Sequence, residues 1–290
     1  MNWRRRWRPH YLFSVATPGH GEMLGQCREK MGETILDCGA FSYFQRGLPT
    51  PNVLHHTRYA LDLQDKYGLD YLVQLDVIRD VQKTIENYRY QRKFGFCPVL
   101  TVGQEVETVP EEDRNRLLFL SYSREAAQRR SVAEHLEIKS VCPKIHIFGM
   151  ARKSVIDGVL PYSCDTTEVA ITTRRNYSYY LSPGTGHAPV HRPLATLPHN
   201  LVFIHAFCMR NNLAPLYKSI MAGIKFPANK MPLPQIDALN KLTAWEFYRE
   251  VEKKTGTKIF NVFYDGDHHG FLSDALEMLD RTPISRRMEK

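Results

Sequence analysis

Short apolar runs and amphipathic segments alternate along the first part of the chain. The apolar runs predict β-strands over residues 11–16, 34–37, 71–78, 96–102, 116–121, 144–149 and 160–167. Amphipathic segments predict helices between some of these strands, over residues 53–67, 80–94 and 124–139. Strands that alternate with helices are typical of βα units and a parallel sheet. The number of repeats favours an α/β fold of the (β/α)8 type, a TIM-like barrel, over an open sheet.

The regular pattern ends after the strand predicted at 160–167. Arginines and tyrosines mix at 172–180, and residues rich in Pro, Gly and His follow. We therefore expect an irregular insertion after the seventh strand, at about 172–198. The next apolar run, at 201–207, is a candidate for the last strand of the barrel.

The remainder of the chain is interpreted as an extension of the same domain. Residues 227–234 are linker-like, 236–253 have the pattern of a helix, and 258–264 form a last apolar strand. These features predict a C-terminal extension from about residue 227. We expect a single domain over residues 11–290, preceded by a basic and aromatic arm at 1–10.

Three of the predicted strands end in an aspartate: Asp37, Asp76 and Asp165. A lone aspartate after a strand is more often a helix cap or a turn residue than a catalytic group. Recurrence changes this interpretation, because the carboxyl ends of parallel strands meet at one mouth of a barrel, where such folds keep their chemistry. Gly39 follows the first of these acids and would let the backbone approach a ligand closely. The sequence therefore predicts a cluster of carboxylates at this mouth.

Composition favours one large core and a polyanionic partner. The 290 residues are 43% hydrophobic, and no apolar run approaches the roughly 18–20 residues of a membrane span. The N-terminal charges are not followed by the hydrophobic segment of a secretory signal. Six cysteines without a C-x-x-C pair are typical of reduced thiols, so we expect a cytoplasmic protein. The net charge of +8 favours nucleic acid as the partner.

Two stretches combine arginine with aromatic residues in the manner of a nucleic-acid contact. The candidates are Trp3, Arg4, Arg5, Arg6, Trp7 and Arg8 in the first stretch, and Arg174, Arg175 and Tyr177 in the second. Arginines would lie on phosphates, and the aromatic rings would stack on bases. A frayed, solvated terminus and an ordinary surface loop are the alternative interpretations.

One stretch has a metal-like composition, with Asp267, His268 and His269 in a row. It has no partner cluster at a recognisable spacing, so a polar turn is the better interpretation. We therefore expect neither a metal nor a cofactor. The sequence gives no indication of the oligomeric state.

Four short segments follow one another in a specific order and spacing. They are Leu-Asp-Cys-Gly-Ala-Phe-Ser at 36–42, Leu-Asp-Val-Ile-Arg-Asp at 75–80, Ile-His-Ile-Phe-Gly at 145–149 and Pro-Tyr-Ser-Cys-Asp-Thr-Thr at 161–167. In this order they resemble the tRNA-guanine transglycosylase superfamily. The closer likeness is to its bacterial and phage relatives that insert 7-deazaguanines into DNA. The resemblance implies a (β/α)8 barrel, DNA as the partner and cleavage of an N-glycosidic bond.

Carried over position by position, the resemblance implies a role for each acid. Asp165 matches the nucleophile that attacks the sugar C1′ and displaces the base, and Asp37 matches the acid that assists proton transfer. Asp76 matches the acid that hydrogen-bonds the base edge. Such chemistry needs carboxylates, because breaking the bond builds positive charge on the sugar. Further candidates for base recognition are Phe41, Ser42 and His146 in the same segments, and Tyr122 just after the strand predicted at 116–121.

Two departures from the superfamily pattern change the expected reaction. The chain lacks the C-terminal Cys-x-Cys-x-x-Cys zinc site of the tRNA enzymes. Ser121, Tyr122 and Ser123 stand where the relatives have the Gly-Gly that lets backbone approach the deazaguanine. A pocket that cannot seat a deazaguanine leaves water to resolve the glycosyl–enzyme intermediate. We therefore predict a DNA glycosylase that flips out and excises a modified base and leaves an abasic site, for which defence against phage is a natural setting.

Three alternatives stay open. The first is base exchange, in which the enzyme releases guanine and inserts a 7-deazaguanine. The second is a catalytically inactive DNA-binding module on the same barrel, although acids near phosphate weaken affinity unless they have a chemical role. The third is a barrel enzyme that acts on a small molecule, which leaves the basic and aromatic stretches unexplained.

Overall fold

In the computed structural model, the described residues are 7–121, 130–149, 152–167, 178–182, 188–223, 233–263 and 275. The chain divides into two units. The first consists of residues 1–167 and 254–265, and the second of residues 168–253 and 266–290. The three aspartates singled out by the sequence all belong to the first unit.

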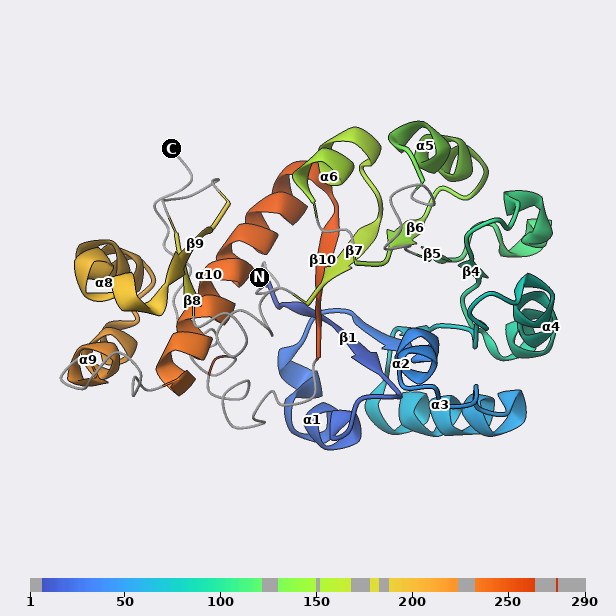
Figure 1. The fold of residues 1–290 in the computed structure, drawn as a ribbon, viewed down its shortest axis with the longest axis horizontal. Coiled ribbons are helices and arrows are strands. Elements are labelled where there is room, and N and C mark those ends of the chain that lie inside the picture. The colour runs from blue at the N-terminus through green and yellow to red at the C-terminus, as the bar shows by residue number, and fades with distance from the viewer. Residues whose placement is uncertain are drawn as a thin grey trace, which may run out of the picture. The chain divides into compact units, whose positions relative to one another are not determined.

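The first unit is built on an eight-stranded parallel sheet (Figure 1). Its strand order is β3-β2-β1-β10-β7-β6-β5-β4, and all neighbours run parallel. The strands are β1 (His10–Ser14), β2 (Thr34–Asp37), β3 (Tyr71–Leu72), β4 (Val99–Leu100), β5 (Leu118–Leu120), β6 (Ile145–Ile147), β7 (Ser163–Thr166) and β10 (Lys258–Val262). A single parallel bridge between Val73 and Cys97 joins the segments beside β3 and β4, the two ends of this order. The sheet is therefore curled, as in a TIM-like fold.

Side-chain amides replace part of the expected ladder between β3 and β4. Both strands are only two residues long, much shorter than the strands predicted over 71–78 and 96–102. The buried Gln74 side chain accepts a hydrogen bond from the backbone N–H of Val99 (2.9 Å), and Gln91 accepts one from Leu75 (2.7 Å). These bonds satisfy buried backbone donors that a longer strand would have paired. The prediction of an α/β fold with a parallel TIM-like sheet is thus confirmed, but the sheet is not closed as the predicted barrel, since only a single bridge stands where a ladder between β3 and β4 was expected.

Helices surround the curled sheet (Figure 1). Asn52 caps α3 by accepting a hydrogen bond from the N–H of Leu54 (2.9 Å), and Asp80 caps α4 through Lys83 (2.8 Å). Gly68, at φ 63°, ends α3 after Tyr67, where the helix predicted at 53–67 was expected to end. The helices of this unit are α1 (His20–Cys27), α2 (Ala40–Gln45), α3 (Val53–Tyr67), α4 (Val81–Gln91), α5 (Val132–Val141) and α6 (Lys153–Val159), and its 3-10 turns are η1 (Arg28–Lys30), η2 (Arg92–Phe94), η3 (Val106–Thr108) and η4 (Glu111–Asp113).

The sheet is packed on both of its faces, as the fully buried apolar strand β5 illustrates. Phe119 of β5 points into the curled sheet, whereas its neighbours Leu118 and Leu120 point to the opposite face, toward α5 and α6. The residues that fill the inside are Leu12, Ile35, Val73, Cys97, Val99, Leu117, Phe119 and Phe260. The inside of the sheet is therefore a packed core, which leaves the strand ends as the place for a site.

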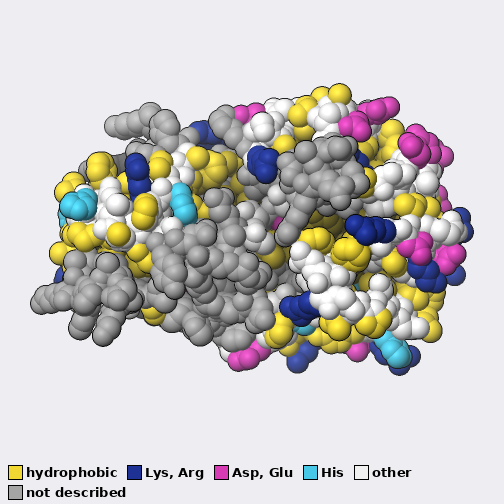
Figure 2. All heavy atoms as spheres, viewed as in Figure 1, with side chains coloured by type: hydrophobic (Ala, Val, Ile, Leu, Met, Phe, Trp, Pro, Cys, Tyr) yellow, Lys and Arg dark blue, Asp and Glu magenta, His cyan; other side chains and the backbone are white. Residues whose placement is uncertain are grey.

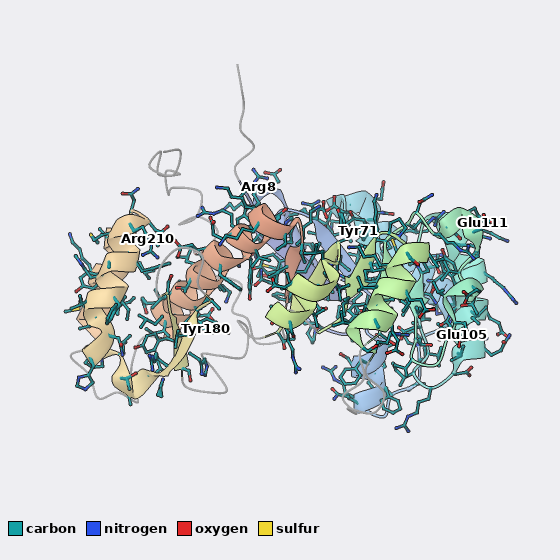
Figure 3. All side chains as sticks on the ribbon, turned by 90° about the horizontal axis from the view of Figure 1, so that it is seen from above. Arg8, Tyr71, Glu105, Glu111, Tyr180 and Arg210 are labelled. Atoms are coloured by element: carbon teal, nitrogen blue, oxygen red, sulfur yellow. The ribbon has the colours of Figure 1, made fainter. Side chains whose placement is uncertain are left out.

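A polar network lies at the amino ends of the strands. The Lys258 ammonium group donates to Glu33 and to the hydroxyl of Tyr162 (2.7 Å). Tyr162 in turn donates to Glu33 (3.0 Å) and lies 2.9 Å from the hydroxyl of Tyr71, which Figure 3 labels. Because these residues come from β10 and from the starts of β2, β3 and β7, the network links strands that are far apart in the sequence.

The eighth strand of the sheet is β10, and not residues 201–207 as the sequence analysis proposed. Residues 201–207 belong to helix α8 (Leu201–Arg210). Its buried residues Ile204, Phe207 and Cys208 have the i, i+3, i+4 spacing of a helix face. The strand Lys258–Val262, which was expected inside a C-terminal extension, pairs with β1 and β7 instead. The segment between the seventh and eighth strands of the sheet is therefore much longer than the insertion predicted at 172–198.

The second unit contains a β-hairpin and three described helices. The Asn240 side chain of α10 accepts a hydrogen bond from the N–H of Tyr180 (2.7 Å), and Arg210 pairs with Glu246 (3.0 Å); Tyr180 and Arg210 are labelled in Figure 3. Among the described residues, no helix has the length and hydrophobicity that a bilayer crossing requires. The elements are β8 (Ser178–Leu181), β9 (Val190–Pro193), η6 (Leu194–Thr196), η7 (Pro198–Asn200), α8, α9 (Ala214–Gly223) and α10 (Leu233–Thr255).

Candidate active site

Asp37 is the last residue of β2, and the turn that follows holds its carboxylate. The backbone N–H of Gly39 donates to Asp37 Oδ2 (3.0 Å). Gly39 lies at φ 75°, in the left-handed region, and a Cβ on it would lie 2.7 Å from the Cβ of Ala16. Glycine is therefore required here both by the backbone conformation and by the close approach of the β1 loop.

Asp165 lies in β7 and is nearly buried, with 6% of its surface exposed. Its Oδ1 accepts hydrogen bonds from the backbone N–H of Gly149 (2.7 Å) and from Nε2 of His146 (3.2 Å). Its Oδ2 accepts none from any residue that the structure describes. One oxygen of this carboxylate is thus anchored, and the other is left for a ligand.

His146 is fully buried behind Asp165. Its Nδ1 lies 2.9 Å from the hydroxyl of Ser163. In the tautomer that carries its proton on Nε2, the ring donates to Asp165 and its Nδ1 accepts a hydrogen bond from the serine hydroxyl. The ring also packs against Phe119 and Phe148, with centroids 4.9 Å and 5.1 Å away. We proposed His146 for base recognition, and the structure places it where it orients Asp165.

Asp76 follows β3 and is also nearly buried. The thiol of Cys38 donates to Asp76 Oδ1 (2.9 Å). Burial and the charge of Asp76 raise the pKa of Cys38 well above its ordinary value, so Cys38 stays a neutral thiol and a hydrogen-bond donor. Cys38 orients the third carboxylate, and sequence reasoning did not identify it, although it adjoins Asp37.

The three carboxylates act on one another electrostatically. The pKa of Asp37 is raised from 3.8 to about 7, first by burial and then by the charges of Asp76 and Asp165. The N–H of Gly39 and the hydroxyl of Ser14 oppose this change only in part. Burial likewise raises the pKa of Asp76. The structure therefore brings the three predicted acids together and gives Asp37 a proton affinity suited to exchange protons near neutral pH.

Arg130 fixes the neighbouring strand ends. Its guanidinium donates to the carbonyls of Leu100 (3.3 Å), Thr101 (2.6 Å) and Ser121 (3.1 Å), at the carboxyl ends of β4 and β5. Sequence reasoning did not single out this arginine, because its partners are backbone groups that no motif reveals.

Of the other predicted site residues, some lie within the described part of the chain and the rest lie outside it. Phe41 and Ser42 lie in the first turn of α2, directly after the Asp37 turn, and Phe41 is exposed. In the N-terminal stretch, the Trp7 ring packs edge-on against His10, and Arg8 donates to the carbonyl of Glu29. The candidates that lie outside the described residues are Trp3, Arg4, Arg5, Arg6, Tyr122, Arg174, Arg175, Tyr177, Asp267, His268 and His269. Across the described ranges, no three His, Cys, Asp or Glu side chains are arranged to hold a metal ion.

Comparison with known proteins places the chain in no family. It matches no protein-family model, and it has no significant match among curated proteins. The function must therefore be argued from the geometry of the site.

Proposed function

We propose that the protein is a DNA glycosylase that excises a modified base through a covalent intermediate on Asp165. The observation that carries the proposal is the pairing of two acids in different states. Asp165 has one anchored and one open oxygen, and the pKa of Asp37 is about 7. A glycosidic bond is cleaved by this kind of pair, one carboxylate attacking the sugar and one acid serving the leaving group.

In the first proposed step, Asp165 Oδ2 attacks C1′ as the bond between C1′ and the base nitrogen breaks. Asp37, protonated, donates its proton to the leaving base, and an ester forms between the sugar and Asp165. The positive charge that develops on the sugar lies among carboxylates, which stabilise it. Asp76, oriented by Cys38, accepts N–H donors from the edge of the flipped base.

In the second proposed step, Asp37 takes a proton from water, and the hydroxyl attacks C1′ and releases Asp165. The product is an abasic site, and both acids return to their starting states. On this interpretation the curled sheet is related to the (β/α)8 barrel of the tRNA-guanine transglycosylase superfamily, which the four segments resemble. DNA, rather than a small molecule, is the proposed substrate because of the net charge of +8.

The test compares the wild type with Asp165→Asn on plain DNA and on DNA that carries modified bases. Free base is measured by mass spectrometry, and abasic sites are measured by cleavage in alkali. We expect Asp165→Asn to lose at least about a hundredfold in base release, the scale of one electrostatic group in a transition state. Asp62→Asn is the matched control, because Asp62 is exposed on α3.

Two results would contradict the proposal in different ways. Near-normal base release by Asp165→Asn would remove this residue as the nucleophile. Incorporation of labelled 7-deazaguanine into DNA that stays resistant to alkali would establish base exchange instead of hydrolysis.

A further inference from the structure

An exposed apolar and basic surface adjoins the candidate active site. We define it by Phe41, Phe44, Leu48, Arg46 and Arg79 and refer to it as the rim patch. The first three side chains are 46%, 45% and 49% exposed, respectively. Helix α2, which carries two of them, begins at the residue after Gly39, whose N–H binds Asp37. The rim patch is therefore directly connected to the turn that holds a proposed catalytic acid.

The rim patch is formed by the segments that follow β2 and β3. Arg79, in the loop after β3, lies with its guanidinium carbon 5.2 Å from the centroid of the Phe44 ring on α2. Arg79 adopts φ 66°, in the left-handed region that residues other than glycine rarely occupy. It stands three residues after Asp76 and directly before Asp80, the cap of α4. The left-handed backbone of Arg79, directly before the N-terminus of α4, thus places its guanidinium beside the Phe44 ring.

The charge of the rim patch is positive. Arg46 donates a hydrogen bond to the carbonyl of Ala16 (3.4 Å). Neither Arg46 nor Arg79 forms an ion pair with a carboxylate in the part of the chain that the structure describes. On the face shown in Figure 2, hydrophobic side chains lie interspersed with Lys and Arg over the part of this unit that carries α2. Exposed aromatic rings can stack on bases, and guanidinium groups without a carboxylate partner can bind phosphates, so the rim patch is suited to a nucleic-acid strand.

We infer that the rim patch binds the nucleic-acid strand that flanks the flipped nucleotide. Arg46 and Arg79 contact phosphates, and Phe41 and Phe44 stack on the bases or sugars next to the excised one. This inference rests on the proposed function, since the strand is the substrate of the adjacent acids. The partner has unpaired bases at this place, because the face of a ring is accessible for stacking only outside a duplex.

The experiment measures binding without turnover, in the Asp165→Asn background. A fluorescently labelled single-stranded oligonucleotide is titrated with protein at several salt concentrations, and its polarisation is recorded. Phe44→Ala is expected to weaken binding about tenfold, the effect of losing one stacked base. Arg79→Gln is expected to reduce the slope of log affinity against log salt by about 0.7, one phosphate contact on a single strand.

Matched controls lie on the same unit, on elements other than those that build the rim patch. Phe94→Ala removes a ring that is 42% exposed in η2, and Arg58→Gln removes an exposed arginine of α3. Both should leave affinity and salt slope unchanged. Phe44→Leu keeps apolar area and loses the ring face, so it should bind the oligonucleotide about as weakly as Phe44→Ala.

The outcomes separate this inference from the proposed function. If the parent protein binds the oligonucleotide and the rim variants bind it equally well, the inference is overturned and the glycosylase proposal stands. If the parent binds no nucleic acid, both are overturned. If Phe44→Ala converts a dimer into a monomer in a mass measurement and leaves DNA affinity unchanged, a second copy of the chain covers the rim patch instead.

Discussion

Replacing Asp37 with asparagine should stabilise the protein above neutral pH while it impairs catalysis. The pKa of Asp37 in the folded protein is about 7, against 3.8 for the ordinary group. Between these two values the folded state holds a proton that the unfolded state has released. The free energy of unfolding therefore falls as the pH rises through this window, and it is level above the folded pKa. Asparagine resembles the uncharged acid and removes this dependence.

The pKa values set the size of the effect. A difference of about three pH units, at about 1.36 kcal/mol each, gives about 4 kcal/mol as an upper bound. Asp37 is only partly buried by surface area, so water screens part of this cost, and we expect about 2–4 kcal/mol at pH 8. Near pH 4, where the folded wild type carries a neutral Asp37, the two proteins should be about equally stable. The hydrogen bond from Gly39 is kept, because the asparagine oxygen can accept it.

Urea denaturation of the wild type and Asp37→Asn at pH 4 and pH 8 measures this difference directly. Titrating groups remote from the site are common to both proteins and cancel in the comparison, whereas the relief of charge repulsion on Asp76 and Asp165 is part of the measured difference. Asp62→Asn, an exposed substitution, should show no such dependence on pH. The reasoning is refuted if the stability difference is the same at both pH values, or if Asp37→Asn is the less stable protein at pH 8.

Three further predictions concern residues around the site and the sheet. His146→Phe should keep the ring packing and lose the hydrogen bond to the proposed nucleophile, so base release at saturating DNA should fall at least about tenfold, and His146→Gln should recover part of it. Equal rates for both variants would exclude an orienting role. Gly39→Ala should lower the unfolding free energy by about 1–2 kcal/mol or more, since φ is 75° and the Cβ meets Ala16, and an unchanged melting temperature would contradict this. Lys258→Met should lower the free energy of unfolding by about 1–3 kcal/mol, because it leaves Glu33 without its cation. Adding Glu33→Gln should recover part of this loss. If the effects of the two substitutions simply add in urea denaturation, the two side chains are not coupled.

The strands that carry the three acids could be predicted because their local pattern is simple. Strands β2 and β7 are short and mostly buried, and each carries an aspartate at or near its carboxyl end. Helix α8 could not be predicted in this way. Its exposed face carries Val202 and Phe203, at 77% and 55% exposure, so the apolar run 201–207 hides the helical period. The role of β10 as the eighth strand depends on pairing with β1 and β7, which no local pattern encodes.

The contacts within the site are only partly accessible from the sequence. His146 pairs with Ser163 across β6 and β7, and Ser163 and Asp165 are two residues apart on one strand. Side chains two residues apart on a strand share a face, so the ring of His146 reaches Asp165 once this register is known. The sequence predicts both strands but not their register. The thiol bond from Cys38 to Asp76 likewise depends on how the loops after β2 and β3 meet.

The donors around the three carboxylates share one property, which bears on the chemistry. Asp37 is held by a backbone N–H, Asp165 by a backbone N–H and an imidazole, and Asp76 by a thiol. In the described part of the chain, no lysine or arginine pairs with any of the three. Arg130, the arginine at the neighbouring strand ends, is bound to carbonyls instead. An arginine among the acids would pair with them and return the pKa of Asp37 toward its ordinary value. Without one, the negative charge of the acids is not compensated by a cation, which in the proposed reaction would favour a transition state that carries positive charge on the sugar.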